Sequence, residues 1–245
     1  MHTRLVPLVL ALCAGGVRAA DALPPPPLQG PPQPPSLAVS AIDLASAELR
    51  WRSSLDAFAE QDRRARPPTG GVLFVGSSSI RLWDGLETAF APHPGVLKRG
   101  FGGSRLADCV LFADRLVTPY QPRQVVLYAG ENDIDEGASP VDVLLRYERF
   151  VQYVHKIAPG TRIAFVSIKP SPARQALLPA IQNANRLIRA YTEGQPLLDY
   201  IDVHGPMLDD QGRPRPELYA PDRLHLNAAG YALWRELIAP RLRQP

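Results

Sequence analysis

The chain has 245 residues, of which 45% are hydrophobic and 21% are charged. This length is enough for a single domain with a sizeable core. The formal net charge at pH 7 is +3, and no basic cluster or aromatic ladder accompanies it, so the sequence gives no indication of a nucleic-acid partner. No apolar run is long enough to predict a transmembrane segment.

Residues 1–22 are typical of a secretory signal peptide. Arg4 provides a positive start, residues 5–14 form a short apolar run, and small residues around Ala19 and Ala22 offer cleavage sites. Cys13 lies inside the apolar run, which is a poor context for lipidation. We therefore expect the mature protein to be periplasmic or secreted, and the exact cleavage site stays open.

Cleavage after Ala19 would change both the charge and the cysteine content. It would remove Arg4 and Arg18, leaving 25 basic residues against 24 acidic ones and a net charge of +1. Cys109 would then be the one remaining cysteine, so no internal disulfide is expected. It lies among apolar residues at helical spacing, where a lone thiol is most often a small core residue.

The next segments differ from one another in composition. Residues 23–37 are dominated by proline and predict an extended linker. Residues 38–64 place apolar residues at helical spacing with charges between them, which predicts a helix that packs on the core. Prolines and glycines at 67–71 end this helix, so residues 38–70 are expected to be a helix and a connector.

From residue 71 onward, short apolar segments alternate with amphipathic ones. This alternation predicts a parallel sheet with helices on both faces, and it has too few units for an eight-fold barrel. The predicted strands are residues 72–75, 96–99, 125–129, 163–166 and 200–203. The predicted helices are residues 104–117, 140–157, 173–191 and 227–242, with a further helical pattern resuming at residue 80; Ser139 and Pro140 give the helix at 140–157 a strong start signal.

Four polar segments follow, or lie near, the carboxyl ends of different predicted strands. They are residues 76–78, 102–104, 130–133 and 222–225. In a parallel sheet these ends meet at one edge, which is where open α/β folds bind ligands. We therefore expect the four segments to lie close together.

The first of these segments begins a run of three consecutive hydroxyls, Ser77, Ser78 and Ser79, that follows a buried strand and leads into a helix. One interpretation is a serine nucleophile beside the free N–H groups of the helix start. The other is that the serines only cap the helix. Side-chain direction alternates through an extended turn, so composition alone does not choose among the three.

Asp222 and His225 lie three residues apart just before the last predicted helix. This spacing allows the carboxylate to reach the imidazole locally, and ester cleavage needs such a base with such an orienting group. A surface aspartate beside an unrelated histidine is the alternative. Among the other histidines, His204 is the second candidate for the base, whereas His93 and His155 have weaker contexts.

Asn132 and Gly103 lie in the two remaining segments. Asn132 directly follows the third strand segment, where it either makes a turn or directs its amide at a developing oxyanion. Gly103 either permits a tight turn or brings a backbone N–H close to the substrate. The residues alone leave both alternatives open.

The order of these segments resembles the sequence blocks of the SGNH hydrolases, the GDSL-type lipases and esterases, over residues 71–242. Residues 74–80 (FVGSSSI) resemble the first block, and residues 99–104 (RGFGGS) resemble the second. Residues 130–133 (GEND) match the third block, Gly-x-Asn-Asp, and residues 222–225 (DRLH) match the last, Asp-x-x-His.

The resemblance implies a role for particular residues in these blocks. Ser78 falls on the nucleophile position, and His225 and Asp222 fall on the base and its orienting acid. The oxyanion-hole positions fall on Ser78, Gly103 and Asn132. The resemblance implies no metal and no cofactor.

The chain departs from the family's commonest pattern at Ser77, where aspartate is usual, and at Ser104, where aspartate is frequent. The change at Ser77 is expected to affect loop rigidity more than chemistry. The resemblance also implies a single-domain, three-layer α/β/α sandwich over residues 71–245. Its sheet would be flavodoxin-like, with five parallel strands in the order 2-1-3-4-5.

These observations together predict an exported serine esterase that acts through an acyl-enzyme, on short-chain or acetyl esters of carbohydrates or small molecules. A lysophospholipase or thioesterase of the same superfamily is one alternative. A non-catalytic flavodoxin-like module that binds an anion or a sugar is another, weakened by the lack of a Gly-Lys-Ser/Thr phosphate loop. A metal site at Asp202, His204 and Asp209 is a remote alternative, because their spacing matches no strong ligand pattern.

Overall fold

A parallel sheet forms the centre of the computed structural model, which describes residues 41–244, with side chains from residue 44 onward. The predicted signal peptide and proline-rich linker, residues 1–37, lie outside the described residues. The sheet has five parallel strands in the order β2-β1-β3-β4-β5, which confirms the predicted order. The strands are β1 Val72–Gly76, β2 Val96–Gly100, β3 Gln124–Tyr128, β4 Arg162–Val166 and β5 Leu198–Ile201.

The inner strands are buried on both faces, as their continuous apolar sequences predicted. Every residue of β1 and β3 is buried. Alternate side chains of β1 point to opposite faces, so Leu73 and Val75 join one core cluster while Val72 and Phe74 join the other. The sheet therefore separates two hydrophobic cores, and each needs a layer of helices to cover it.

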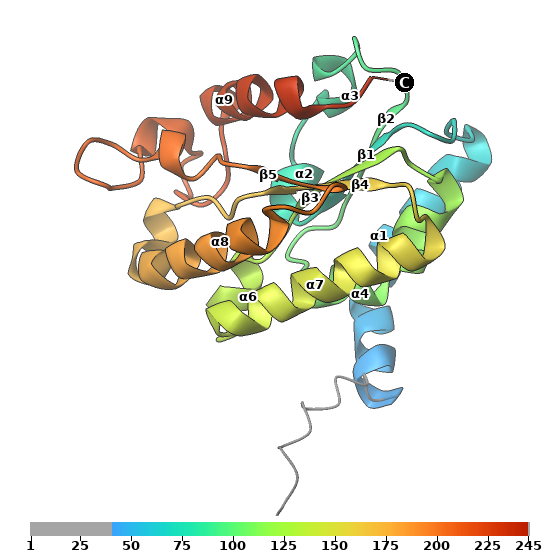
Figure 1. The fold of residues 1–245 in the computed structure, drawn as a ribbon, viewed down its shortest axis with the longest axis horizontal. Coiled ribbons are helices and arrows are strands. Elements are labelled where there is room, and N and C mark those ends of the chain that lie inside the picture. Colours follow the sequence, from blue (N-terminus) through green and yellow to red (C-terminus); the bar gives the residue numbers. More distant parts are fainter. Residues whose placement is uncertain (1–40, 245) are drawn as a thin grey trace, which may run out of the picture. The chain divides into compact units, whose positions relative to one another are not determined.

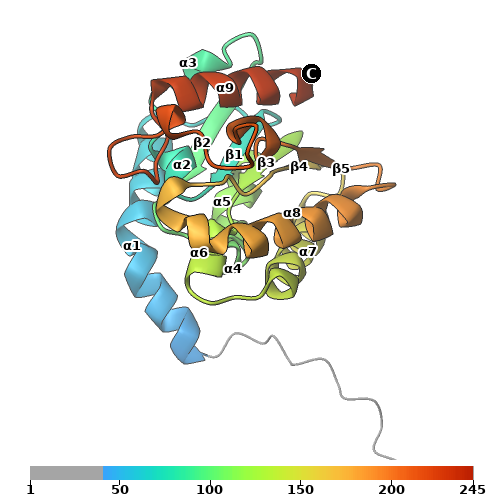
Figure 2. The ribbon, with the colours of Figure 1, turned by 90° about the vertical axis from the view of Figure 1, so that its left-hand side faces the viewer.

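Helices cover both faces of the sheet and complete three layers (Figure 1). Helices α4, α5, α7 and α8 lie on one face and α3 and α9 on the other, an arrangement that is also seen from the side in Figure 2. The bounds are α3 Leu86–Ala89, α4 Leu106–Leu111, α5 Ala113–Val117, α7 Pro140–Ile157, α8 Leu178–Thr192 and α9 Ala228–Ile238. Two short helices, α2 Ser78–Arg81 and α6 Glu131–Asp135, follow β1 and β3 directly.

Helix α1, Ala41–Arg64, lies beside the β2 end of the sheet (Figure 2). Its Trp51 and Leu55 are buried in the core on the α7 side. Asp62, in its last turn, forms an ion pair with Arg99 of β2 and accepts a hydrogen bond from the Tyr120 hydroxyl. The helix predicted for residues 38–64 is therefore present over residues 41–64, and its last turn is bound to the sheet.

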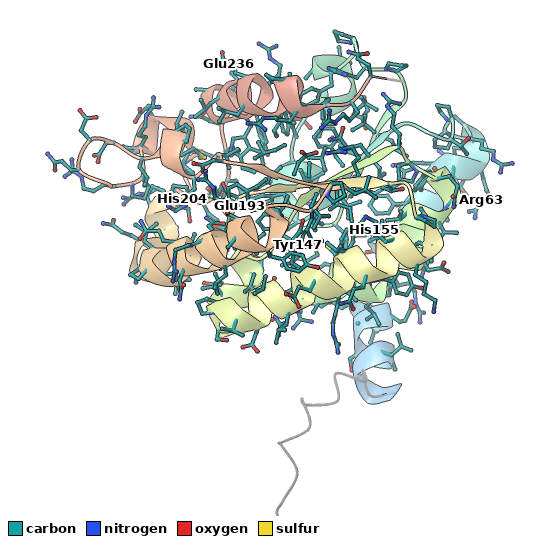
Figure 3. The ribbon with its side chains drawn as sticks, viewed as in Figure 1. Arg63, Tyr147, His155, Glu193, His204 and Glu236 are labelled. Atoms are coloured by element: carbon teal, nitrogen blue, oxygen red, sulfur yellow. The ribbon has the colours of Figure 1, made fainter. Side chains whose placement is uncertain are left out.

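Helix α7 shows how local sequence signals set an element. Ser139 is its N-cap, its Oγ accepts a hydrogen bond from Asp142 N at 3.2 Å, and Pro140 occupies the first turn. Tyr147, labelled in Figure 3, is fully buried, and its ring centroid lies 5.0 Å from that of Phe165 of β4. The signals at residues 139 and 140 thus start a helix whose apolar face packs directly on the sheet.

Several predicted elements differ in their limits, three of them in a way that has a structural reason or changes the type of helix. The helix predicted for residues 104–117 is divided into α4 and α5 at Phe112, whose backbone is not helical and whose side chain is buried. The helix predicted for 173–191 begins with a 3₁₀ segment, Pro172–Leu177, before α8. Strand β5 lies two residues earlier than predicted, because its pairing with β4 starts at Leu198 opposite Ile163.

Cys109 is free and fully buried on α4, as expected for a small core residue. Within the part of the chain that the structure describes, no helix combines the length and apolar character needed to cross a membrane.

Candidate active site

The four polar segments singled out in the sequence follow strand ends or precede a helix in the fold. Ser78 follows β1, Gly103 follows β2 and Asn132 follows β3, whereas His225 precedes α9. Since all strands are parallel, these segments gather at the carboxyl edge of the sheet.

Ser78 is held at the start of α2 by a tight turn after β1. Gly76 has φ +150°, and a Cβ at this position would lie 1.9 Å from the Tyr128 carbonyl oxygen, so only glycine fits. Ser77 donates its N–H to the same carbonyl at 3.0 Å. Ser77 and Ser79 are buried, whereas Ser78 is partly exposed, so the turn presents one hydroxyl of the three.

The Ser78 hydroxyl meets the histidine of the last segment. Ser78 Oγ lies 3.0 Å from His225 Nε2, and His225 Nδ1 lies 2.6 Å from Asp222 Oδ2. An ionised carboxylate only accepts hydrogen bonds, so Nδ1 carries the proton that faces Asp222. Nε2 of the neutral ring is then free to accept the serine proton.

Asp222 is fixed within its own turn although its side chain is 50% exposed. Its Oδ1 accepts hydrogen bonds from the backbone N–H groups of Leu224 and His225, each at 2.9 Å. The bonds from the His225 ring and from these two backbone groups lower the pKa of Asp222 to about 2. The carboxylate therefore stays charged at neutral and mildly acidic pH.

Gly103 and Asn132 lie in two loops that are joined by hydrogen bonds. Asn132 Nδ2 donates to the Ser104 carbonyl at 3.0 Å, and Asp133 Oδ2 accepts from Leu106 N at 2.8 Å. The Asn132 Oδ1 accepts from Arg174 Nη1 at 3.1 Å, which fixes the orientation of the amide. An amide nitrogen carries two hydrogens, so one donor of Asn132 remains available.

Comparison with protein families identifies the chain. Residues 72–233, well over half of the sequence, match the family described as GDSL-like Lipase/Acylhydrolase. The chain belongs to this family. It is therefore an ester-hydrolysing enzyme of the serine hydrolase class, as the resemblance predicted.

Solved structures share the fold of this GDSL-like enzyme. A Streptococcus pneumonia protein named as a platelet activating factor aligns with a TM-score of 0.71 at 22% identity, over 82% of this chain and 96% of its own. A GDSL-like lipase from Bacteroides thetaiotaomicron aligns with a TM-score of 0.65 at 20% identity, over 76% and 96%. An acetyl-xylooligosaccharide esterase from Geobacillus aligns with a TM-score of 0.57 at 15% identity, over 71% and 94%. No curated protein matches the sequence.

A buried charge network, which the sequence analysis missed, lies behind Asn132 of the GDSL-like enzyme. Lys169 Nζ is fully buried and lies 2.6 Å and 2.9 Å from the two carboxylate oxygens of Glu131. Glu131 also accepts hydrogen bonds from the hydroxyls of Tyr128, at 2.9 Å, and Ser171, at 3.1 Å. Burial opposes the charged form of Glu131, but Lys169 and Arg174 outweigh it, so the pKa of Glu131 is lowered.

Arg174 links this network to the asparagine. One guanidinium nitrogen binds Asn132 Oδ1 and lies 3.4 Å from Glu131, and the other binds Asp135 of α6 at 2.8 Å. The available sequence signal was the position of Lys169, three residues beyond the buried strand β4. A polar residue just beyond a strand end falls at the edge that holds the other four segments.

The three other described histidines contact groups other than Ser78 and Asp222. His204, labelled in Figure 3, is buried, and its Nδ1 lies 3.0 Å from the Ile168 carbonyl oxygen, while its Nε2 has no hydrogen-bond partner. Burial lowers the pKa of His204. His155 contacts the Thr161 carbonyl, and His93 lies 3.4 Å from Gln244. Among the described side chains, no three metal-ligating groups converge on one point, so Asp202, His204 and Asp209 form no cluster.

Helix α1 reaches the Gly103 loop although it precedes the family's matched residues. The Trp51 ring packs edge-on against Phe101 with centroids 5.3 Å apart. A Cβ on Gly103, which has φ +84°, would lie 3.6 Å from Trp51 Cη2. The loop is therefore held between Trp51 on one side and α6 on the other.

Proposed function

We propose that this protein is an exported esterase in which Ser78 is the nucleophile, His225 the general base and Asp222 the residue that orients the base. One observation carries the proposal: the hydrogen-bonded sequence from Ser78 Oγ through the His225 ring to Asp222, with distances of 3.0 Å and 2.6 Å. This is the geometry that proton transfer from a serine requires.

In the proposed reaction, Ser78 Oγ attacks the ester carbonyl carbon while its proton moves to His225 Nε2. The carbonyl π electrons move onto the oxygen, giving a tetrahedral oxyanion. Collapse of this intermediate breaks the bond to the alcohol oxygen, and the imidazolium returns its proton to the departing alcohol. Asp222 stabilises the imidazolium through the Nδ1 hydrogen bond. Water then attacks the acyl-enzyme by the same steps and releases the acid and Ser78.

Three donors are proposed to hold the oxyanion: the backbone N–H groups of Ser78 and Gly103 and the free hydrogen of Asn132 Nδ2. Ser78 is the first residue of α2, so its N–H has no partner within the helix. Loss of one oxyanion donor typically lowers the rate about 10²–10³-fold.

Short acyl groups, such as acetyl on carbohydrates or small molecules, are the proposed substrates. The similarity to a structure named acetyl-xylooligosaccharide esterase supports this choice. A signal-like N-terminus supports a substrate outside the cytoplasm. Sequencing the N-terminus of the protein recovered from the periplasm or medium tests export, with cleavage expected near Ala19 to Ala22.

A series of 4-nitrophenyl esters of increasing acyl length tests the activity. We expect the highest kcat/KM for the acetyl or another short ester, and a preference for long chains would favour the lipase-like alternative. Ser78→Ala should lower kcat by at least about 10⁴-fold. Ser77→Ala is the matched control, because Ser77 caps α2 without a side-chain bond and should retain activity within about tenfold. Hydrolysis by Ser78→Ala at the parental rate would overturn the proposal.

A further inference from the structure

A groove of about 550 Å³ lies between α1 and the outer strand β2. Phe58, Asp62 and Arg64 line it from α1, and residues 97–100 line it from β2. Arg81 of α2 and Glu87 of α3 complete the lining. Helix α1, which precedes the segment that matches the GDSL-like family model, forms one wall of the groove.

The groove carries an excess of positive charge. Its lining has four basic residues, Arg64, Arg81, Lys98 and Arg99, and two acidic ones, Asp62 and Glu87.

Three of the basic groups are already bound. Arg64 pairs with Glu60 at 2.8 Å, Lys98 Nζ donates to the Trp83 carbonyl at 2.7 Å, and Arg99 pairs with Asp62. The Arg81 guanidinium, by contrast, has no hydrogen bond or ion pair among the described side chains and is exposed.

Arg81 extends from the groove to the proposed oxyanion loop. It lies three residues after Ser78, and its side chain lies against Gly102, where a Cβ would be only 2.5 Å from Arg81 Nε. Gly102 directly precedes Gly103. The absence of a side chain at 102 therefore leaves room for the guanidinium beside the position where the ester carbonyl would be held.

We propose that Arg81 binds a carboxylate or phosphate group of the substrate, one that extends from the ester at Ser78 toward the groove. This inference rests on the proposed esterase function and names its substrate class: an ester whose alcohol or acyl part is negatively charged. An arginine presents a planar fork of donors that suits both anions, and a cation without a protein partner gives up no existing contact to bind one.

Two acetate esters that differ in one charge test this proposal. The probes are 4-acetoxybenzoate, which carries a carboxylate, and its neutral methyl ester. Arg81→Gln should lower kcat/KM for 4-acetoxybenzoate about tenfold. It should change kcat/KM for the methyl ester less than twofold. For each ester, the kcat/KM of the variant is divided by that of the parent, so the different reactivities of the two leaving groups cancel.

Matched variants separate charge recognition from a structural role. Arg81→Lys should retain part of the preference for the charged ester, because lysine keeps the positive charge but lacks the planar fork of donors. Arg235→Gln removes the same charge from the exposed side of α9, outside the groove, and should leave both esters unaffected. Equal losses on both esters in Arg81→Gln would overturn the proposal, since they would indicate a structural role only.

A binding measurement separates this proposal from the esterase proposal. In a Ser78→Ala background, calorimetry should show tighter binding of 4-acetoxybenzoate than of its methyl ester, with the difference lost on Arg81→Gln. If this difference in binding is found but the parent hydrolyses neither ester, the esterase proposal is wrong and the anion-site proposal is kept. Equal binding of both esters would overturn the anion-site proposal. The same comparison with 4-acetoxyphenyl phosphate shows whether Arg81 favours phosphate over carboxylate.

Discussion

The two sides of Ser78 are built in opposite ways. On one side, Asp222 and His225 lie in a single turn, and the carboxylate is 50% exposed. On the other side, Asn132 is fixed by Arg174, which lies 42 residues away in sequence, and the adjacent Lys169 is fully buried.

This difference indicates which interactions hold the residues of each side in place. The proposed acid–base side is ordered by short-range bonds within the turn, so its loss should reduce catalysis and leave folding nearly unchanged. The proposed oxyanion side adjoins a buried charge pair, so the same network should contribute to both stability and rate. The three predictions that follow test this contrast.

Asp222→Asn should give the largest effect. An asparagine cannot stabilise the imidazolium and can favour the wrong tautomer, so kcat should fall by about 10³–10⁴-fold. The free energy of unfolding in urea should change by less than about 1 kcal/mol, because the site is exposed. Asp210→Asn, on an exposed residue of the neighbouring loop, is the control. A small loss of activity would contradict the assigned role of Asp222.

The lowered pKa of Asp222 gives the parent protein a defined pH dependence of stability, which Asp222→Asn should lack. Its pKa of about 2 lies below the ordinary aspartate value of about 3.9, so the folded state binds fewer protons than the unfolded state at intermediate pH. The stabilising contribution is therefore complete above about pH 4 and is lost as the pH falls toward 2.

Lys169→Met should affect stability more than any variant on the exposed side. It removes the buried cation that lies closest to the Glu131 carboxylate and leaves only Arg174, at 3.4 Å. Removing one partner of a buried ion pair typically costs about 3–5 kcal/mol of unfolding free energy. The double variant Lys169→Met/Glu131→Gln removes both charges and should recover at least half of the loss. Urea denaturation of the parent and both variants measures these values. A loss below about 1 kcal/mol in the single variant would show that the pair does not support the fold.

Arg174→Ala should give the smallest effect, and that effect should fall on kcat rather than on KM. Without the bond to Oδ1, the Asn132 amide keeps only its hydrogen bond to the Ser104 carbonyl and is held less firmly, so kcat should fall about tenfold with little change in KM. Asn132→Ala alone should lower kcat about 10²–10³-fold. Adding Arg174→Ala to that variant should then lower kcat no further. Independent, additive losses would contradict a role for Arg174 in positioning Asn132.

The sequence predicted the sheet well because the inner strands β1, β3 and β4 each contain a continuous apolar segment bounded by turn residues. It predicted the limits of β5 less well, because they depend on pairing with β4, which no local pattern records. The predicted helix over 104–117 was wrong in its continuity for a related reason. The backbone of the buried Phe112 is not helical, and the apolar spacing over residues 104–117 gave no sign of this break between α4 and α5.

The residues of the candidate site also differ in how far local sequence could predict their contacts. Asp222 and His225 could be paired from a spacing of three residues, whereas the choice of Ser78 over its neighbours needed the direction of a turn. Lys169 meets Glu131 across 38 residues of chain, so nothing in the local sequence pairs them. Contacts of this kind are set by the order of strands in the sheet.

Helix α1 has a practical consequence for anyone shortening this protein. Strand β2 is the outer strand of the sheet, and the Asp62 carboxylate neutralises the buried Arg99 guanidinium on it. A recombinant fragment trimmed to residues 72–233 would lack this carboxylate and would leave the Arg99 guanidinium buried without its ion-pair partner. Such a fragment should be less stable, so expression plasmids should keep the codons for the whole of α1.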